Sequence, residues 1–181
     1  MRPPVTYQPE FLTTEEADDL LASMMNEPWE QREFSAYGKV VKVPRLQLWY
    51  GSDGYRYSGQ VFNPRPFPDF LRDLLVRLGG PWPGCEVTSC LANLYRDGND
   101  SVAWHSDDEP ELGPDPVVSC LSLGAERTFQ LKSNEGGHRY DLELGHGSLV
   151  TMEHGCQRNW RHQIPKRRRV TRARVSLTFR G

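Results

Sequence analysis

The chain has 181 residues, of which 37% are hydrophobic and 25% are charged, and its formal net charge is −2. This length suits one domain with one substantial core. No apolar run is long enough to cross a bilayer and none near Met1 resembles a secretory signal, which argues against a membrane protein. We therefore expect an intracellular monomer, cytoplasmic in a bacterium or nuclear in a eukaryote.

The four cysteines indicate thiols rather than bridges. They form no C-x-x-C pair and are too sparse for a disulfide framework. We expect buried free thiols, with a disulfide or a zinc site as the alternative. The cysteines are Cys85, Cys90, Cys120 and Cys156.

Basic residues gather near the end of the sequence. After Glu153 there is no acidic residue, whereas nine lysines and arginines follow, four of them consecutive at 166–169. Such a segment is predicted to contact a polyanion such as nucleic-acid phosphates. A solvated basic loop is the alternative.

Two helices are predicted in the first half of the chain. Residues 13–26 have Thr13 or Thr14 as the N-cap, acids in the first turn and an apolar face. Residues 68–78 repeat leucines at helical spacing before a Gly-Gly pair. Both helices are expected to cover a sheet.

Between these helices, the sequence predicts strands and loops. Tyr37, Gly38 and Lys39 suit a hairpin tip, where an exposed aromatic ring could insert into a base stack or simply face solvent. Tyr55 and Tyr57 lie two residues apart, so they share a face if this segment is a strand. A packed core tyrosine is the alternative for Tyr57.

The second half of the chain predicts a β domain. Seven short segments alternate apolar and polar residues and are separated by turns rich in Gly, Asp and Asn. This pattern indicates a mainly β fold with flanking helices, as a barrel or a sandwich. The segments are 86–95, 101–105, 116–124, 127–132, 138–144, 147–153 and 173–180.

A metal centre is predicted from His105 and Asp107, in W-H-S-D-D-E, together with His162, in N-W-R-H. Two imidazoles and one carboxylate form the facial set that leaves three positions open on a non-haem ferrous ion. A structural histidine is the alternative reading of either imidazole.

An arginine-bearing face is predicted on the final strand. Alternation places Arg174, Ser176, Thr178 and Arg180 on one side and apolar residues on the other. The arginine α-carbons lie roughly 20 Å apart along a strand. Side chains that lean inward could hold the two carboxylates of a small dicarboxylate.

Taken in order, these motifs resemble those of AlkB-type Fe(II)/2-oxoglutarate-dependent nucleic-acid dealkylases, most closely the branch that acts on double-stranded DNA. The likeness covers about residues 34–181. It rests on P-R-x-Q at 44–47, Y-R-Y-S-G at 55–59, N-L-Y-R-D-G at 93–98, W-H-S-D-D-E, H-G-S-L, W-x-H and R-x-S-L-T-F-R. It implies one dioxygenase domain over 1–181, with helices and a nucleotide-recognition region at 1–80 and a double-stranded β-helix, or jelly roll, at 85–181.

The resemblance also implies roles for single residues. Fe(II) would be held by His105, Asp107 and His162, and O2 would be the second co-substrate. The residues implied for 2-oxoglutarate are Asn93, Tyr95, Arg174, Ser176 and Arg180. The residues implied for substrate are Tyr37, Arg45, Tyr55, Tyr57, Asp108 and Glu109.

Some of these roles remain open. Tyr57 would stack on a flipped base and Tyr37 would fill the gap that the base leaves. Asp108 and Glu109 could instead orient the metal ligands. Relatives commonly carry asparagine in place of Ser176, so the contact of this serine with 2-oxoglutarate is open and a water could replace it.

The function implied is repair of alkylated DNA by oxidative demethylation of flipped bases such as 1-methyladenine and 3-methylcytosine. The same chemistry on RNA or protein is one alternative, and a nucleic-acid-binding module without catalysis is another. The fold alone decides between none of them.

Overall fold

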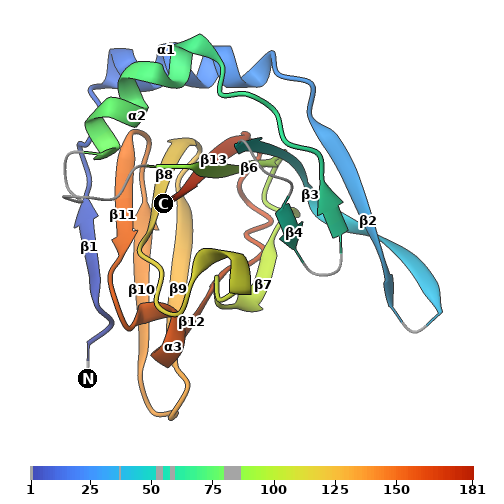
Figure 1. The fold of residues 1–181 in the computed structure, drawn as a ribbon, viewed down its shortest axis with the longest axis vertical. Coiled ribbons are helices and arrows are strands. Elements are labelled where there is room, and N and C mark those ends of the chain that lie inside the picture. The colour runs from blue at the N-terminus through green and yellow to red at the C-terminus, as the bar shows by residue number, and fades with distance from the viewer. Residues whose placement is uncertain (1, 37, 52–54, 58–59, 80–86) are drawn as a thin grey trace.

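The computed structural model describes residues 2–36, 38–51, 55–57, 60–79 and 87–181, and shows two antiparallel sheets (Figure 1). One sheet has the order β1-β11-β8-β13-β6-β3-β2 and the other has the order β10-β9-β12-β7. Strands distant in sequence are neighbours in both sheets, as in a jelly roll. The predicted fold class is confirmed.

The strand bounds are as follows. The larger sheet contains β1 (Val5–Gln8), β11 (Ser148–Met152), β8 (Val118–Gly124), β13 (Arg174–Arg180), β6 (Ser89–Tyr95), β3 (Lys39–Gly51) and β2 (Glu30–Ala36). The smaller sheet contains β10 (Arg139–Leu144), β9 (Arg127–Ser133), β12 (Trp160–Ile164) and β7 (Val102–His105). A separate ribbon consists of β4 (Tyr55–Tyr57) and β5 (Gln60–Phe62).

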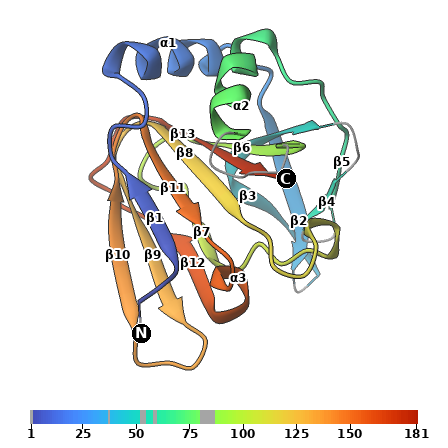
Figure 2. The same cartoon turned by 60° about the vertical axis from the view of Figure 1, so that its left-hand side comes forward.

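Both predicted helices are confirmed, and both cover the larger sheet (Figure 2). Helix α1 (Thr14–Met25) begins with a capping box, in which Thr13 and Glu16 satisfy each other's backbone N–H groups. Helix α2 (Arg72–Gly79) follows the 3₁₀ turn η1 (Asp69–Leu71), so the second helix starts tighter than the sequence predicts. The described residues also include the short helix α3 (Cys156–Asn159) and the 3₁₀ turn η2 (Pro110–Leu112).

The central strand β13 separates the apolar core from the cavity between the sheets. Val175, Leu177 and Phe179 are fully buried and pack in one apolar cluster with residues of α1 and α2. The residues that alternate with them face the cavity: Arg174, Ser176, Thr178 and Arg180. Alternation along one strand therefore assigns one face to stability and the other to the site.

Strands β2 and β3 form a hairpin that projects from the body of the molecule (Figure 1). The second half of β3 pairs with β6, whereas its first residues, from Lys39 to Lys42, pair only with β2. Gly38 takes the left-handed conformation, with φ of +73°, at the tip. Val40 is 68% exposed, so the projecting part presents apolar as well as basic side chains.

The turn after β6 supports the basic loop at 166–172. Gly98 N–H donates to the carbonyl of Val170 and the Gly98 carbonyl accepts from the Arg167 N–H, both at 2.7 Å. A Cβ on Gly98 would lie 1.8 Å from the Arg167 carbonyl oxygen. The loop backbone therefore crosses the turn where only glycine leaves room.

Gly98→Ala is expected to destabilise the fold by about 1–3 kcal/mol, because the backbone of the basic loop must move to admit the methyl group. The melting temperature should fall by several degrees. Gly145→Ala is the control, since a Cβ at Gly145 meets no atom within 4 Å. Equal melting temperatures for the two variants would contradict the close crossing.

Candidate metal centre and anion pocket

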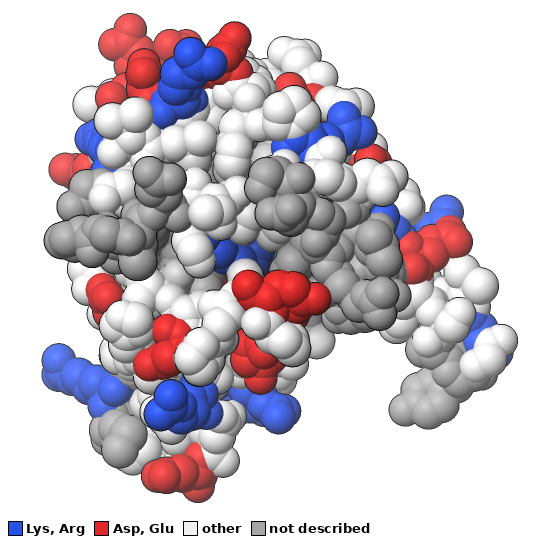
Figure 3. Space-filling view, in the orientation of Figure 1, with Lys and Arg blue, Asp and Glu red and all other residues white. Residues whose placement is uncertain are grey.

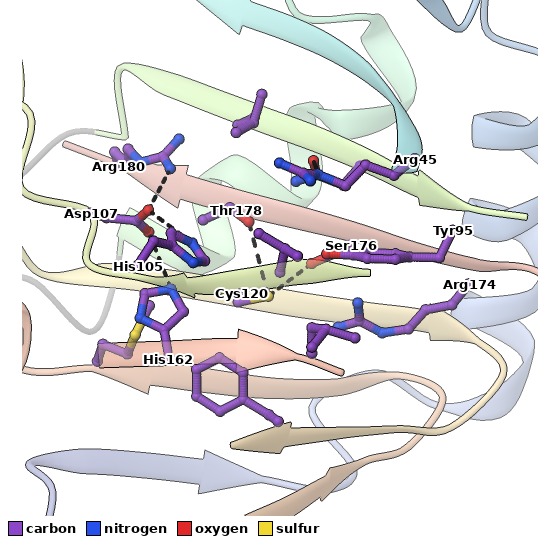
Figure 4. A pocket seen from close by; sticks show the side chains of 16 residues that line it. Arg45, Tyr95, His105, Asp107, Cys120, His162, Arg174, Ser176, Thr178 and Arg180 are labelled. Carbon is purple, nitrogen blue, oxygen red and sulfur yellow. Dashed lines mark hydrogen bonds and ion pairs between the residues drawn. The ribbon is translucent and has the colours of Figure 1, made fainter. Parts of the chain in front are cut away.

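Two side chains from one turn, His105 and Asp107, and a third that is distant in sequence, His162, converge at one end of the cavity (Figure 4). His105 Nε2 lies 3.7 Å from one carboxylate oxygen of Asp107, and His162 Nε2 lies 4.0 Å from the other. One ligand atom from each residue lies within 4.8 Å of the others. The sequence prediction that these residues meet is confirmed, and their spacing fits one shared metal ion.

Strand pairing brings the two histidines together. His105 ends β7 and lies directly opposite His162 in β12, with ring centroids 4.2 Å apart. Helix α3 holds the turn that carries Asp107, because the Asp107 backbone N–H donates to the Gln157 side chain at 2.9 Å. Ser106 donates to the Trp160 carbonyl at 3.1 Å. Strands β7 and β12 and helix α3 therefore position the triad.

Hydrogen bonding and charge hold these groups in the protonation states that bind metal. His105 Nδ1 lies 2.8 Å from the Ala103 carbonyl; a proton donated there leaves the Nε2 lone pair free. Burial lowers the pKa of His105, and burial with the neighbouring His105 lowers the pKa of His162 to about 3. Burial alone would raise the pKa of Asp107, but Arg180 and the two imidazoles outweigh it and lower this pKa to about 2. At neutral pH, the site presents two neutral imidazoles and a carboxylate.

The two arginines of β13 occupy different ends of the cavity. Arg180 Nη2 lies 3.4 Å from Asp107 Oδ1, so this guanidinium is an immediate neighbour of the metal ligands. Arg174 lies at the opposite end of the strand (Figure 4). The sequence prediction assigns both arginines to 2-oxoglutarate, and the structure adds the ion pair of Arg180 with Asp107.

Arg174 forms an anion pocket. It is 1% exposed, its Nε donates to Ser122 Oγ at 2.7 Å, and its guanidinium lies over the Tyr95 ring at 5.2 Å. Neither of its terminal nitrogens has a hydrogen-bond partner among the described residues. Two buried, unpaired donors on one planar cation fit a carboxylate, and no described acid forms an ion pair with them. The donor set therefore fits 2-oxoglutarate between Arg174 and the metal centre.

Asn93 lies between the two ends of the cavity and is oriented by its neighbours. Its carbonyl oxygen accepts from Arg45 Nε at 2.7 Å and from Gln47 Nε2 at 3.0 Å. Its amide N–H groups are therefore the donors that remain for a ligand. Arg45 is 6% exposed and lines the cavity, so any contact of this arginine with substrate would be made deep inside the site.

Ser176 and Cys120 share the cavity wall. Their side-chain oxygen and sulfur lie 2.9 Å apart, and Thr178 lies 4.0 Å from the same sulfur. The prediction of free buried thiols is confirmed for Cys90, Cys120 and Cys156. Sequence reasoning missed that Cys120 faces the site, although its place in an alternating segment is the signal that could have shown it.

The predicted substrate contacts lie in several settings. Tyr37 lies outside the described residues, and Tyr55 and Tyr57 are the two ends of β4, which pairs with β5. Asp108 is exposed beside the metal turn, and Glu109 is half-buried as the N-cap of η2. In the lower half of Figure 3, acidic side chains lie near the middle of this face, basic ones lie below them, and acidic atoms appear again at the lowest edge.

The basic loop at 166–172 lies away from the metal ligands. It leads into Arg174, whereas the ligands adjoin Arg180 at the other end of β13. Arg127 attaches the start of this loop to the turn after β6. It is 1% exposed and donates to the carbonyls of Asp97, Asp100 and Pro165 at 2.7–3.1 Å. Sequence reasoning missed this buried arginine.

The chain matches the family model of the 2OG-Fe(II) oxygenase superfamily over residues 4–180. It is 39% identical over 187 residues to "Alpha-ketoglutarate-dependent dioxygenase alkB homolog 3" of Homo sapiens. The aligned region covers 97% of this chain and 65% of that protein. It is 34% identical over 181 residues to "DNA oxidative demethylase ALKBH2" of Arabidopsis thaliana, covering 84% of this chain and 58% of the relative. The chain thus spans less than two thirds of either relative.

Solved structures agree on the fold. OsALKBH1 superposes with a TM-score of 0.64 at 18% identity, covering 100% of this chain and 99% of the other. A prolyl-4-hydroxylase from Pseudomonas putida gives a TM-score of 0.63 at 18% identity, covering 98% and 91%. At these identities the likeness establishes the architecture alone. No helix among the described residues has the length and apolar character needed to span a membrane.

Proposed function

Because this chain belongs to the 2OG-Fe(II) oxygenase superfamily, we propose that it removes alkyl groups from nucleic-acid bases by oxidative demethylation, with 1-methyladenine and 3-methylcytosine in DNA as substrates. The observation that carries the proposal is the pairing of a two-histidine, one-carboxylate centre with the buried Arg174 pocket. The similarity to AlkB homologues favours a base over a protein side chain.

Bound Fe(II) and 2-oxoglutarate would supply the oxidation, in which O2 converts 2-oxoglutarate to succinate and CO2 and hydroxylates the N-alkyl carbon, which then leaves as an aldehyde. The protein positions the reactants. His105, Asp107 and His162 would hold the metal, and Arg174 would fix the distal carboxylate of 2-oxoglutarate. Buried walls at Leu91, Phe129 and Ile164 exclude water from the reaction.

Duplex DNA is the nucleic acid that we propose. The β2–β3 hairpin and the basic loop are both attached to the turn after β6, and both suit a duplex. Arg96 in this turn donates to Gln31 of β2 at 3.4 Å, and Gly98 bonds the basic loop. The hairpin offers exposed apolar residues for the gap left by a flipped base, and the basic loop offers cations for phosphates. The projecting part of the hairpin and the basic loop both lie outside the cavity, which Arg45 of β3 lines.

The proposal is tested by mass spectrometry of a panel of methylated oligonucleotides after incubation with Fe(II), 2-oxoglutarate and O2. A mass decrease equal to one CH2 in strands with 1-methyladenine or 3-methylcytosine, with equimolar succinate, is the expected result. Demethylation of RNA strands alone would move the function to RNA. Binding without succinate formation would leave a nucleic-acid-binding module instead.

The hairpin is expected to matter for duplexes and not for single strands. Val40→Ser with Val41→Ser should lower turnover of methylated duplex about tenfold, because unstacking a base costs a few kcal/mol that an apolar wedge partly offsets. Turnover of the same single strand should change less than twofold. Val76→Ser is the control, since Val76 is 76% exposed on α2. Equal losses on both substrates would contradict a wedge.

A further inference from the structure

Three basic residues form one row across the outer face of the smaller sheet. Arg161 of β12 lies directly opposite Lys132 of β9, and Lys132 lies directly opposite Arg139 of β10. Directly paired residues point to the same side of a sheet, and His162, next to Arg161, points into the cavity. These three side chains therefore point outward, and we call them the cationic row.

The cationic row departs from the pattern on the rest of this face. In one adjacent row, Gln163 donates to Gln130, which donates to Asp141. In the next, Glu143 accepts from Thr128 and from Arg167. Like charges placed directly opposite one another destabilise a sheet. Residue arrangements that cost stability in this way are typical of functional sites.

An aromatic ring contacts two of the three residues of the row. Lys132 Nζ lies 4.4 Å from the centroid of the Trp104 ring, and the Arg139 guanidinium carbon lies 5.8 Å from it. Arg139 also lies 3.5 Å from Asp141, whereas Arg161 has no ion-pair partner among the residues that the structure describes. The row is thus partly preorganised and retains an excess of positive charge.

The cationic row and the ring that contacts it adjoin the metal ligands along the two strands that carry the histidines. Trp104 immediately precedes His105, and Arg161 immediately precedes His162. A groove of ≈ 560 Å³ runs from Ser106 and Asp108, which flank the metal ligand Asp107, to Arg158 and to Arg161 of the row. A chain whose base enters the cavity could therefore continue along this groove to the outer face.

Resting on the proposed function, we propose that the cationic row, with Arg158, binds the backbone phosphates that flank the base held at the metal centre. Adjacent strands are about 4.8 Å apart, so the row spans about 10 Å. Each strand of B-form DNA carries one phosphate per about 3.4 Å of helix axis, so the row matches the axial rise of about three nucleotides. The partner is the phosphate backbone of the damaged strand, in contrast to the hairpin, which acts on the gap in a duplex.

The test measures binding of a methylated single strand by fluorescence anisotropy, without O2, at several salt concentrations. Arg161→Gln should weaken binding about five- to tenfold, and the double variant with Lys132→Gln should weaken it further. Each lost phosphate contact should reduce the salt slope by about 0.7. Arg161→Lys should restore most of both. Arg72→Gln is the charge-matched control, because the Arg72 side chain is 76% exposed on α2.

Turnover separates this inference from the proposed function. On a methylated nucleoside, which has no phosphate, the double variant should keep the wild-type kcat. If it binds the oligonucleotide with the same affinity and salt slope as Arg72→Gln while the wild type demethylates, the row is not a phosphate site and the function stands. If the wild type demethylates nothing but the double variant loses affinity and slope, the function is wrong and the row still binds phosphate.

Discussion

Asp107→Ala is expected to lower formaldehyde release from methylated DNA by at least about 1,000-fold, equivalent to about 4 kcal/mol of barrier. The substitution removes the only carboxylate of the metal triad and leaves two imidazoles that cannot hold Fe(II) facially. Metal affinity, measured by calorimetry with Mn(II) under the same buffer, should fall in parallel. The fold should persist, because the backbone of this turn is held through Gln157 and not through the carboxylate.

Asp108→Ala is the matched control for this prediction. Asp108 is the next acid along the chain and is exposed, whereas Asp107 is 3% exposed. The control should keep metal affinity, whatever its effect on substrate. Retained turnover in Asp107→Ala, with full Mn(II) binding, would exclude this aspartate from the metal centre.

Arg174→Gln is expected to raise the KM for 2-oxoglutarate about 100-fold, equivalent to about 3 kcal/mol, because a buried carboxylate would lose its charged partner. Metal affinity should not change, since Arg174 lies at the opposite end of β13 from Asp107. Arg174→Lys should recover only part of the loss, because an ammonium cannot offer two parallel donors. The measurement is succinate formation as 2-oxoglutarate is varied.

The control for Arg174 is Arg167→Gln. Arg167 is part-exposed in the basic loop near the same end of the cavity, and its side chain bonds Glu143. It should leave the KM for 2-oxoglutarate unchanged. If the KM rises equally in both variants, general charge and not a fork at Arg174 attracts the co-substrate.

The sequence predicted those elements whose local residue pattern is compatible with a single secondary structure. The final strand alternates without interruption from Arg174 to Arg180, so its two faces could be assigned before the fold was known. Likewise, the capping residues at Thr13 and Glu16 mark a helix start through local hydrogen bonds. Both helices and all seven predicted strands of the second half are present.

Elements that depend on distant partners were missed. Strand β12 carries His162, but polar residues at Arg161 and Gln163 face outward and a register shift follows His162, so the apolar pattern is broken. Strand β1 has four residues and exists through its pairing with β11. The metal triad was found because its residue types are specific, while the pairing of Arg180 with Asp107 depends on how two sheets face each other.

The contact between Arg180 and Asp107 also bears on how the site takes up metal. A buried carboxylate with no counter-ion would destabilise the surrounding structure or take up a proton. Here the Arg180 guanidinium neutralises the carboxylate, so the three metal ligands should keep their arrangement when a chelator removes the ion. Iron could then be lost and regained without refolding, and apoprotein prepared at neutral pH should recover full activity as soon as ferrous salt is added.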